Sequence, residues 1–319
     1  MGLFMKRKIN FLLENIRRFQ INTRKHLPGR FLYAWISFAF CFIIFGCSFD
    51  DFFRYKFYEK SNYERNKFVT YRRSRRIIKQ YNDVKEIGIL QDKVRFNGYF
   101  HEYIGREWLD LRTATAEEFE EFVKTHESVL MKPLRGGQGK GIYKLTAKEL
   151  IDGKAVLEQD REFVAEEILV QHKDMKKLNH TSVNTVRVLT FKNQVVACAL
   201  RTGGDGAIVD NLHSNGVCAH VDIQTGIVDY PCIDNAYNVY LYHPTSGEKM
   251  VGFQIPNWSS VKETVRKAAS MIPGIAYIGW DVAILEDGVA LIEGNHDPGH
   301  DVVQMIAQTG IYEDINGLK

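Results

Sequence analysis

The chain contains 319 residues with a mass of 36.8 kDa, of which 45% are hydrophobic and 25% are charged. These values exclude a disordered, collagen-like or disulfide-stapled protein, and the length predicts about two folded domains. The five cysteines include no CxxC pair, so we predict no zinc site or disulfide framework, and we expect a reducing compartment, most simply the cytoplasm.

Charge is divided unevenly along the chain. Residues 1–80 carry 18 Lys/Arg and 5 Asp/Glu, a net charge of +13, whereas the remainder carries 24 and 34, a net charge of −10. A basic region of this kind suits an anionic membrane or polymer, and it also suits docking on the acidic remainder of the same chain. We predict that residues 1–80 form a basic, aromatic-rich helical region.

An uncharged stretch rich in aromatic residues lies within this region, from Phe31 to Phe49. Basic residues flank it on both sides, which opposes a membrane span, and its length and flanks do not fit a secretory signal. We expect a helix that is buried or lies in the surface of the membrane's inner face, beside the basic segment 6–30, as a peripheral contact, with a membrane span as the less favoured alternative. The cluster Arg72–Arg76 is expected to be a solvated helix face, and no nucleic-acid partner is predicted, because no recognition motif accompanies it.

A lysine-bearing strand precedes a glycine-rich loop. Residues 128–133 (SVLMKP) predict a short buried strand, and another apolar stretch begins at Ile142. The intervening sequence RGGQGKG lets the backbone approach a polyphosphate closely, and Lys132, Arg135 and Lys140 can neutralise its charge. The loop is neither a Walker A motif nor a dinucleotide fingerprint. We predict a phosphate-binding loop, with a plain hairpin turn as the alternative.

Two further segments flank this loop. Upstream, Gln91-Asp92-Lys93 precedes a helix-like segment, and downstream, residues 162–170 (EFVAEEILV) predict an acidic, apolar strand. Such a strand could hold an adenine and its ribose, although taken alone it is more simply an edge strand.

The C-terminal part of the chain predicts a sheet with one long helix. Alternating polar and apolar residues indicate half-buried strands. The expected elements are strands at 181–191 and 195–201, a polar loop at 210–216, strands at 216–223 and 226–230, and a helix at 260–271.

The most informative segment is residues 277–299 (YIGWDVAILEDGVALIEGNHDPG). Two predicted strands are joined by a Glu-Asp-Gly turn, which is a strong hairpin signal. Asp281 lies on the first strand, and Glu293 and Asn295 end the second, so three oxygen ligands meet at one end of the hairpin. Such ligands suit a hard cation such as Mg²⁺, which completes its coordination with substrate phosphates. We predict a metal–nucleotide site here.

The order of these motifs, from about residue 45 to residue 298, resembles the ATP-grasp superfamily. Within it, the sequence is similar to the sugar-transfer-associated ATP-grasp proteins linked to polysaccharide biosynthesis. The resemblance implies an α+β fold in which two lobes enclose ATP, preceded here by the basic helical region. The implied lobes are residues 81–170, with the glycine loop, and residues 171–319, with the metal site.

The resemblance also implies roles for individual positions. Lys93 and Lys132 match the two nucleotide-phosphate lysines, and Arg187 and Arg201 match arginines that meet the γ-phosphate or an acyl phosphate. Asp281, Glu293 and Asn295 match a metal triad. The implied nucleotide contacts further include the lid residues Arg135, Gly136, Gly137, Gly139 and Lys140, and the hinge residues Glu166, Glu167, Ile168 and Val170, with either glutamate facing the nucleotide.

The reaction implied by the resemblance is a carboxylate–amine ligation that uses ATP and two Mg²⁺. A small-molecule or glycan carboxylate becomes an acyl phosphate, and an amine such as an amino acid displaces the phosphate, with Lys132, Arg187 and Arg201 as catalytic residues. The usual N-terminal substrate domain of these ligases has no counterpart in this sequence, which leaves the acceptor site open.

Two alternative functions are also consistent with the sequence, and four histidines are candidate substrate-orienting residues. The alternatives are an ATP-grasp kinase that phosphorylates a hydroxyl group and a membrane-associated nucleotide-binding protein without activity. Four histidines could orient a substrate, although a structural role is favoured for each: His172, His213, His296 and His300.

Overall fold

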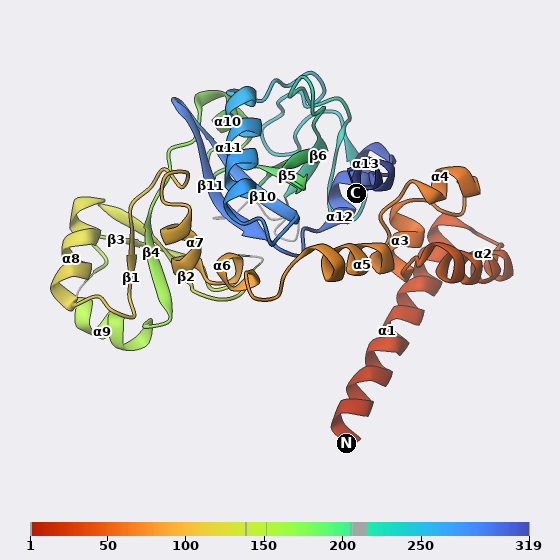
Figure 1. Cartoon of the computed structure of the whole chain (residues 1–319), viewed down its shortest axis with the longest axis horizontal. Coiled ribbons are helices and arrows are strands. Elements are labelled where there is room, and N and C mark those ends of the chain that lie inside the picture. Colours follow the sequence, from red (N-terminus) through yellow and green to blue (C-terminus); the bar gives the residue numbers. More distant parts are fainter. Residues whose placement is uncertain (1, 138, 151, 205, 207–215, 319) are drawn as a thin grey trace. The chain divides into compact units, whose positions relative to one another are not determined.

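The computed structural model describes the chain except for residues 1, 138, 151, 205, 207–215 and 319 (Figure 1). The chain divides into two compact units, residues 1–79 together with 300–319, and residues 80–299. Residues 300–319 were expected in the C-terminal lobe but lie in the first unit. Buried Gln304 explains this placement, because it donates to the carbonyl of Val69 at 3.0 Å and accepts from the Val69 amide at 2.8 Å.

The first unit is helical (Figure 1). The uncharged stretch forms a 15-residue helix that ends at Phe45, because Gly46 takes a left-handed φ of 67° and its N–H bonds the carbonyl of Cys41. In the part of the chain that the structure describes, no helix is long and apolar enough to cross a membrane. The helices are α1 (Gly2–His26), α2 (Phe31–Phe45), α3 (Phe49–Arg54), α4 (Asn62–Asn66), α5 (Tyr71–Tyr81, beginning in this unit), α12 (His300–Ala307) and α13 (Tyr312–Gly317).

An aromatic cluster forms the core of this unit. Phe19 of α1 is 1% exposed, and its ring lies 4.4–5.9 Å, between centroids, from several aromatic rings of α2 and α3. These rings belong to Trp35, Phe38, Phe49, Phe52 and Phe53. One face of α2 is therefore buried, in agreement with the expectation of a buried helix. Its other face is exposed.

The second unit contains a small antiparallel sheet with strand order β1-β4-β2-β3. Helices α8 (Ala116–Thr125) and α9 (Gly153–Gln159) pack against it around buried residues such as Phe119, Val129 and Leu157. The predicted strand at 128–133 is confirmed, whereas the one at 162–170 ends at Glu167. The strands are β1 (Trp108–Asp110), β2 (Ser128–Pro133), β3 (Tyr143–Thr146) and β4 (Phe163–Glu167).

A seven-stranded antiparallel sheet forms the larger part of this unit, with order β11-β10-β5-β6-β7-β8-β9. The predicted hairpin of residues 277–295 is confirmed as β10 and β11. Residues 226–230 form only isolated bridges, and most of the predicted polar loop at 210–216 lies outside the described residues. The strands are β5 (Thr185–Phe191), β6 (Gln194–Thr202), β7 (Val217–His220), β8 (Cys232–Ile233), β9 (Val239–Tyr240), β10 (Tyr277–Leu285) and β11 (Gly288–Asn295).

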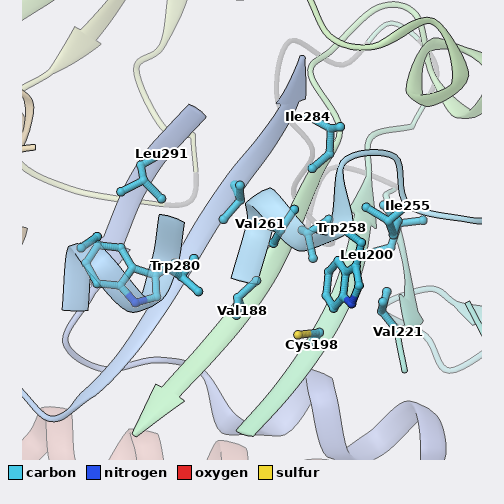
Figure 2. Packing of buried hydrophobic residues seen from close by; sticks show 14 of the residues in the cluster. Val188, Cys198, Leu200, Val221, Ile255, Trp258, Val261, Trp280, Ile284 and Leu291 are labelled. Atoms are coloured by element: carbon cyan, nitrogen blue, oxygen red, sulfur yellow. The ribbon is translucent and has the colours of Figure 1, made fainter. Parts of the chain in front are cut away.

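Helix α11 (Trp258–Met271) covers one face of the large sheet, and its Trp258 and Val261 join the same core as Val188, Leu200 and Trp280 (Figure 2). The short helices α6 (Ile87–Gln91) and α7 (Lys93–Tyr99) also contact β11, while α10 (Lys173–Leu178) adds Met175 and Leu178 to the core. Burial of these apolar side chains stabilises strands β5, β6, β10 and β11, which carry the predicted site residues of the large sheet.

Candidate functional site

A buried carboxylate with three donors lies on β4, an inner strand of the small sheet. Glu166 is 2% exposed, and its carboxylate accepts from Lys132 Nζ at 2.5 Å, from Arg106 Nε at 2.7 Å and from Asn97 Nδ2 at 2.9 Å. Lys132 and Glu166 lie on adjacent strands, because β2 pairs with β4 so that Lys132 stands opposite Val164. The strand register therefore brings the two side chains to one face of the sheet.

Electrostatics keep this carboxylate ionised. Burial alone would raise the pKa of Glu166, but the positive charges of Arg106 and Lys132 outweigh burial and hold the pKa well below its usual range. Arg106 also donates to the carbonyl of Leu291 at 2.8 Å, so it joins the small sheet to β11. Sequence reasoning missed Arg106 and Asn97, because neither lies in a motif.

A second buried carboxylate, Asp281, is held by two arginines of the large sheet. Asp281 on β10 stands opposite Arg187 on β5, and Arg201 lies on the next strand, β6. Arg187 binds both carboxylate oxygens, with Nε at 2.5 Å from Oδ1 and an η-nitrogen at 2.9 Å from Oδ2, and Arg201 binds Oδ2 at 2.9 Å. Burial would raise the pKa of Asp281, but the two guanidinium charges outweigh it and the pKa is lowered.

The other predicted metal ligands lie beside Asp281. Glu293 on β11 stands opposite Asp281, and Asn295 Nδ2 donates to Glu293 Oε1 at 3.0 Å. Burial and then the negative charge of Asp281 raise the pKa of Glu293. Two adjacent carboxylates and an amide oxygen form a donor set that suits Mg²⁺. Clusters of three or more His, Cys, Asp or Glu that could hold a metal are absent from the described residues, so a metal here needs the amide or the substrate as a ligand.

The glycine loop and Lys93 lie next to these carboxylates. Lys93 is the first residue of α7, whose N-cap Asp92 accepts hydrogen bonds from the amides of Val94 and Arg95. Lys93 Nζ donates to the carbonyl of Gly136 at 3.4 Å. Burial lowers the pKa of Lys93, and the carboxylate of Glu293 opposes that effect. The loop backbone is left-handed at Gly136, Gly139 and Gly141, a conformation that favours glycine.

Two cavities meet at Lys93, Ile292 and Glu293. The smaller cavity, about 130 Å³, contains most of the predicted nucleotide residues together with an apolar wall, and the larger, about 710 Å³, contains the start of the glycine loop and the end of β11. Predicted residues lining the smaller cavity are Lys93, Lys132, Gly139, Glu166, Glu167, Ile168, Arg201, Asp281 and Glu293.

The remaining predicted residues divide into two groups. Those lining the larger cavity are Arg135, Gly136, Gly137 and Asn295, besides Lys93 and Glu293. Among the described residues, Lys140, Val170 and Arg187 line neither cavity, although Arg187 reaches the site through Asp281. Val170 is 65% exposed, because β4 ends before it.

The four predicted histidines lie in different places. His296 lines the larger cavity and its Nε2 lies 3.0 Å from Gln91 Nε2, whereas His172 caps α10 by accepting from the amide of Asp174 at 3.1 Å. His300 begins α12 in the first unit, and His213 lies outside the described residues.

The family is established by sequence. Residues 72–319 match the model of the sugar-transfer associated ATP-grasp family. The chain belongs to this family. The match confirms the predicted family, and the observed helices and antiparallel sheets agree with the predicted α+β ATP-grasp fold.

Solved structures show distant likenesses. The ATP-grasp ligase PsnB complexed with minimal precursor is 17% identical, with a TM-score of 0.47 over 75% of this chain and 63% of PsnB. The D-alanine–D-alanine ligase from Bacillus anthracis is 14% identical, with a TM-score of 0.44 over 82% of this chain and 72% of that ligase. In four PsnB complexes, the chain spans only 53–63% of PsnB. No curated protein matches the chain significantly.

Proposed function

We propose that this ATP-grasp protein is a carboxylate–amine ligase that acts on a surface polysaccharide or its precursor. The observation that carries the proposal is the convergence of Lys93 and Lys132 with the carboxylates of Asp281 and Glu293 around one small cavity. In all, four cationic side chains and four carboxylates line this partly apolar cavity, a set that suits a metal-bound triphosphate better than it suits a neutral ligand.

Different side chains of the cavity are proposed to bind different parts of the nucleotide. Leu130, Ile142 and Ile168 supply an apolar wall for the adenine, and Lys93 and Lys132 neutralise the phosphates. Asp281, Glu293 and Asn295 would hold Mg²⁺, two ions as the family resemblance implies, and the metal supplies further neutralisation of the triphosphate charge. Both Arg187 and Arg201 bind Asp281, but only Arg201 also lines the cavity.

The proposed reaction has two steps. A carboxylate oxygen of the substrate attacks the γ-phosphorus, the bond to the bridging oxygen of ADP breaks, and an acyl phosphate forms. An amine then attacks the acyl carbon, loses a proton and displaces inorganic phosphate to leave an amide. Lys132, Arg187 and Arg201 are proposed to act by charge and position, because phosphoryl transfer between anions depends on neutralisation more than on a protein nucleophile.

The Glu293→Gln variant tests this proposal. It keeps the shape of the side chain but removes the charge of a proposed metal ligand, so we expect Mg–ATP turnover to fall by at least about 100-fold while the circular dichroism spectrum is unchanged. Exposed Glu263 on α11 provides the matched control, and Glu263→Gln should keep wild-type turnover. Unchanged turnover in Glu293→Gln would contradict the proposed site, and ADP release with a phosphorylated product in place of free phosphate would favour the kinase.

We also propose that the first unit contacts the anionic inner face of the membrane from the cytoplasm. The supporting observation is the exposed face of α2, which is apolar along its length and adjoins exposed Arg24, Lys25 and Arg30. An apolar helix face beside cations suits an interface of lipid tails and anionic headgroups. The exposed residues of α2 are Phe31, Leu32, Tyr33, Ile36, Phe40, Phe42, Ile43 and Ile44.

Vesicle sedimentation tests the membrane contact. We expect the protein to sediment with phosphatidylglycerol vesicles more than with phosphatidylcholine vesicles, and an Ile36→Glu/Ile43→Glu double variant or deletion of residues 1–49 to abolish this difference. Val84 is 81% exposed in the second unit, so Val84→Glu adds a negative charge outside the proposed membrane contact and should sediment as the wild type does. Sedimentation of the double variant at the wild-type level would contradict the proposal.

A further inference from the structure

The larger cavity extends beyond the residues assigned to the nucleotide, to Gln91, Arg95 and His296. Its volume of about 710 Å³ lies within the range of about 300–1,000 Å³ that is typical of ligand sites. It meets the proposed nucleotide cavity at Lys93 and Glu293, the pair beside which the reacting phosphate is proposed to lie. A second substrate in this cavity could therefore reach that phosphate.

The wall of this cavity is polar and carries guanidinium groups together with the carboxylates of Asp92, Glu293 and Asp297. Hydrogen-bonding side chains come from Gln91, Asn295 and His296. These amide and imidazole groups suit a ligand with many hydroxyl groups, because each can donate to or accept from a hydroxyl oxygen. The guanidinium groups belong to Arg95, Arg112 and Arg135, which line the larger cavity.

The three arginines are not equivalent. Arg112 is held by Asp110 at 2.7 Å and lies 3.5 Å from Asp92. In the described part of the chain, the guanidinium groups of Arg95 and Arg135 have no hydrogen-bond or ion-pair partner, and both residues are exposed. These two guanidinium groups lie beside the site at which one carboxylate of the substrate is proposed to react. Because neither group is paired, they favour a substrate that carries additional negative charge.

We propose that the larger cavity binds an acidic saccharide with at least two carboxylates, such as a uronic-acid oligosaccharide, as the second substrate. This inference rests on the proposed ligase function. One carboxylate would lie at the junction near Lys93, where it is activated, and a second would pair with Arg95 and Arg135. The hydroxyl groups would bind Gln91 and His296. The saccharide would thus be the substrate whose carboxylate is activated by ATP.

Titration calorimetry on the full chain, saturated with Mg–ADP, tests the proposal. The probes are a digalacturonic acid and the matched neutral disaccharide in which both carboxyl groups are reduced to alcohols. We expect the acid to bind at least about tenfold more tightly than the neutral sugar, and Arg95→Gln to remove most of this preference without changing the affinity for Mg–ADP. Arg266 is exposed on α11, outside both cavities, so Arg266→Gln is the matched control and should bind both sugars as the wild type does.

The outcomes separate this inference from the ligase proposal. Equal affinity for the acid and the neutral sugar, failure of the acid to bind a protein that binds Mg–ADP, or wild-type preference in Arg95→Gln would each overturn the saccharide site. Acid binding without Mg–ADP binding would support the saccharide site and contradict the ligase.

Discussion

Buried charges define the site at the scale of single residues. Glu166 is almost inaccessible to solvent, yet it is ionised because Lys132 and Arg106 surround it. Taking three charges out of water is costly, and removing one partner leaves the others unbalanced. The ion pair with Glu166 therefore holds Lys132 in one position. The stability of the protein depends on each of the three charged side chains.

The Glu166→Gln variant should lose about 3–5 kcal/mol of unfolding free energy at neutral pH, measured by urea denaturation. The folded-state pKa of Glu166 lies below its unfolded value, so its contribution is complete above about pH 4.3 and is lost as the pH falls. The difference between wild type and variant should therefore shrink in acid.

Glu167 on the same strand provides the matched control. It is only partly buried, and its carboxylate accepts one backbone hydrogen bond, from the amide of Glu107 at 3.0 Å. We expect Glu167→Gln to cost about 1 kcal/mol or less. An equal cost for the two variants would show that the ion pairs of Glu166 contribute no more than a surface hydrogen bond.

His243 supplies a pH-dependent prediction outside the site. It is 2% exposed, its Nε2 lies 2.7 Å from Thr202 Oγ1, and its Nδ1 accepts from the amides of Thr245 and Ser246. Burial lowers its pKa, so the stability present above the unfolded pKa of about 6.5 falls as the pH is lowered. Wild type should lose unfolding free energy between pH 7 and pH 5, and His243→Gln should lose less over that interval.

Exposed His180 is the control for this measurement. We expect His180→Gln to retain the wild-type dependence on pH. If His243→Gln retained it as well, another group would be responsible for the acid sensitivity.

At the scale of elements, close backbone contacts fix how segments join. Gly310, between α12 and α13, lies against the chain at Lys67, and a Cβ atom at this glycine would lie 2.1 Å from the Lys67 carbonyl oxygen. The amide of Tyr312 donates to the same carbonyl at 2.8 Å. The backbone cannot move away from an added methyl group without breaking this hydrogen bond.

Gly310→Ala should therefore destabilise the protein by about 1–3 kcal/mol through overpacking, measured by thermal or urea unfolding. Gly317 in α13 has no atom within 4 Å of the position of an added Cβ among the neighbours considered, so Gly317→Ala should be neutral or slightly stabilising. A neutral Gly310→Ala would indicate that α13 can shift away from Lys67.

Sequence patterns predicted the strands and turns that are recognisable from neighbouring residues alone. The β10–β11 hairpin and the strand bearing Lys132 were predicted from alternation and turn residues. A regular hairpin would place Asp281 opposite Ile292, and a β-bulge between Asp281 and Val282, which the pattern did not predict, shifts its partner to Glu293. The partners Arg106 and Asn97 were not predicted, because their contacts with Glu166 join residues 60 and 69 positions apart. The placement of residues 300–319 depends on similar long-range contacts.

At the scale of the whole molecule, charge and chemistry are divided along the chain. The basic N-terminal region carries the exposed apolar face of α2, while the acidic remainder carries both cavities. The proposed substrates follow this division. A basic, apolar region would hold the protein at an anionic surface, and a cavity lined by arginines would select acidic saccharides despite the negative net charge around it.

The most direct test of the central claim incubates the purified protein with Mg–ATP, uronic-acid oligosaccharides and pooled amino acids. ADP and free phosphate are measured together, and the saccharide is examined by mass spectrometry. The ligase account predicts equal amounts of ADP and phosphate that depend on both pools, together with a saccharide whose mass has increased by one amino acid less one water. ADP accompanied by a phosphorylated saccharide, without free phosphate or an amide, would contradict it.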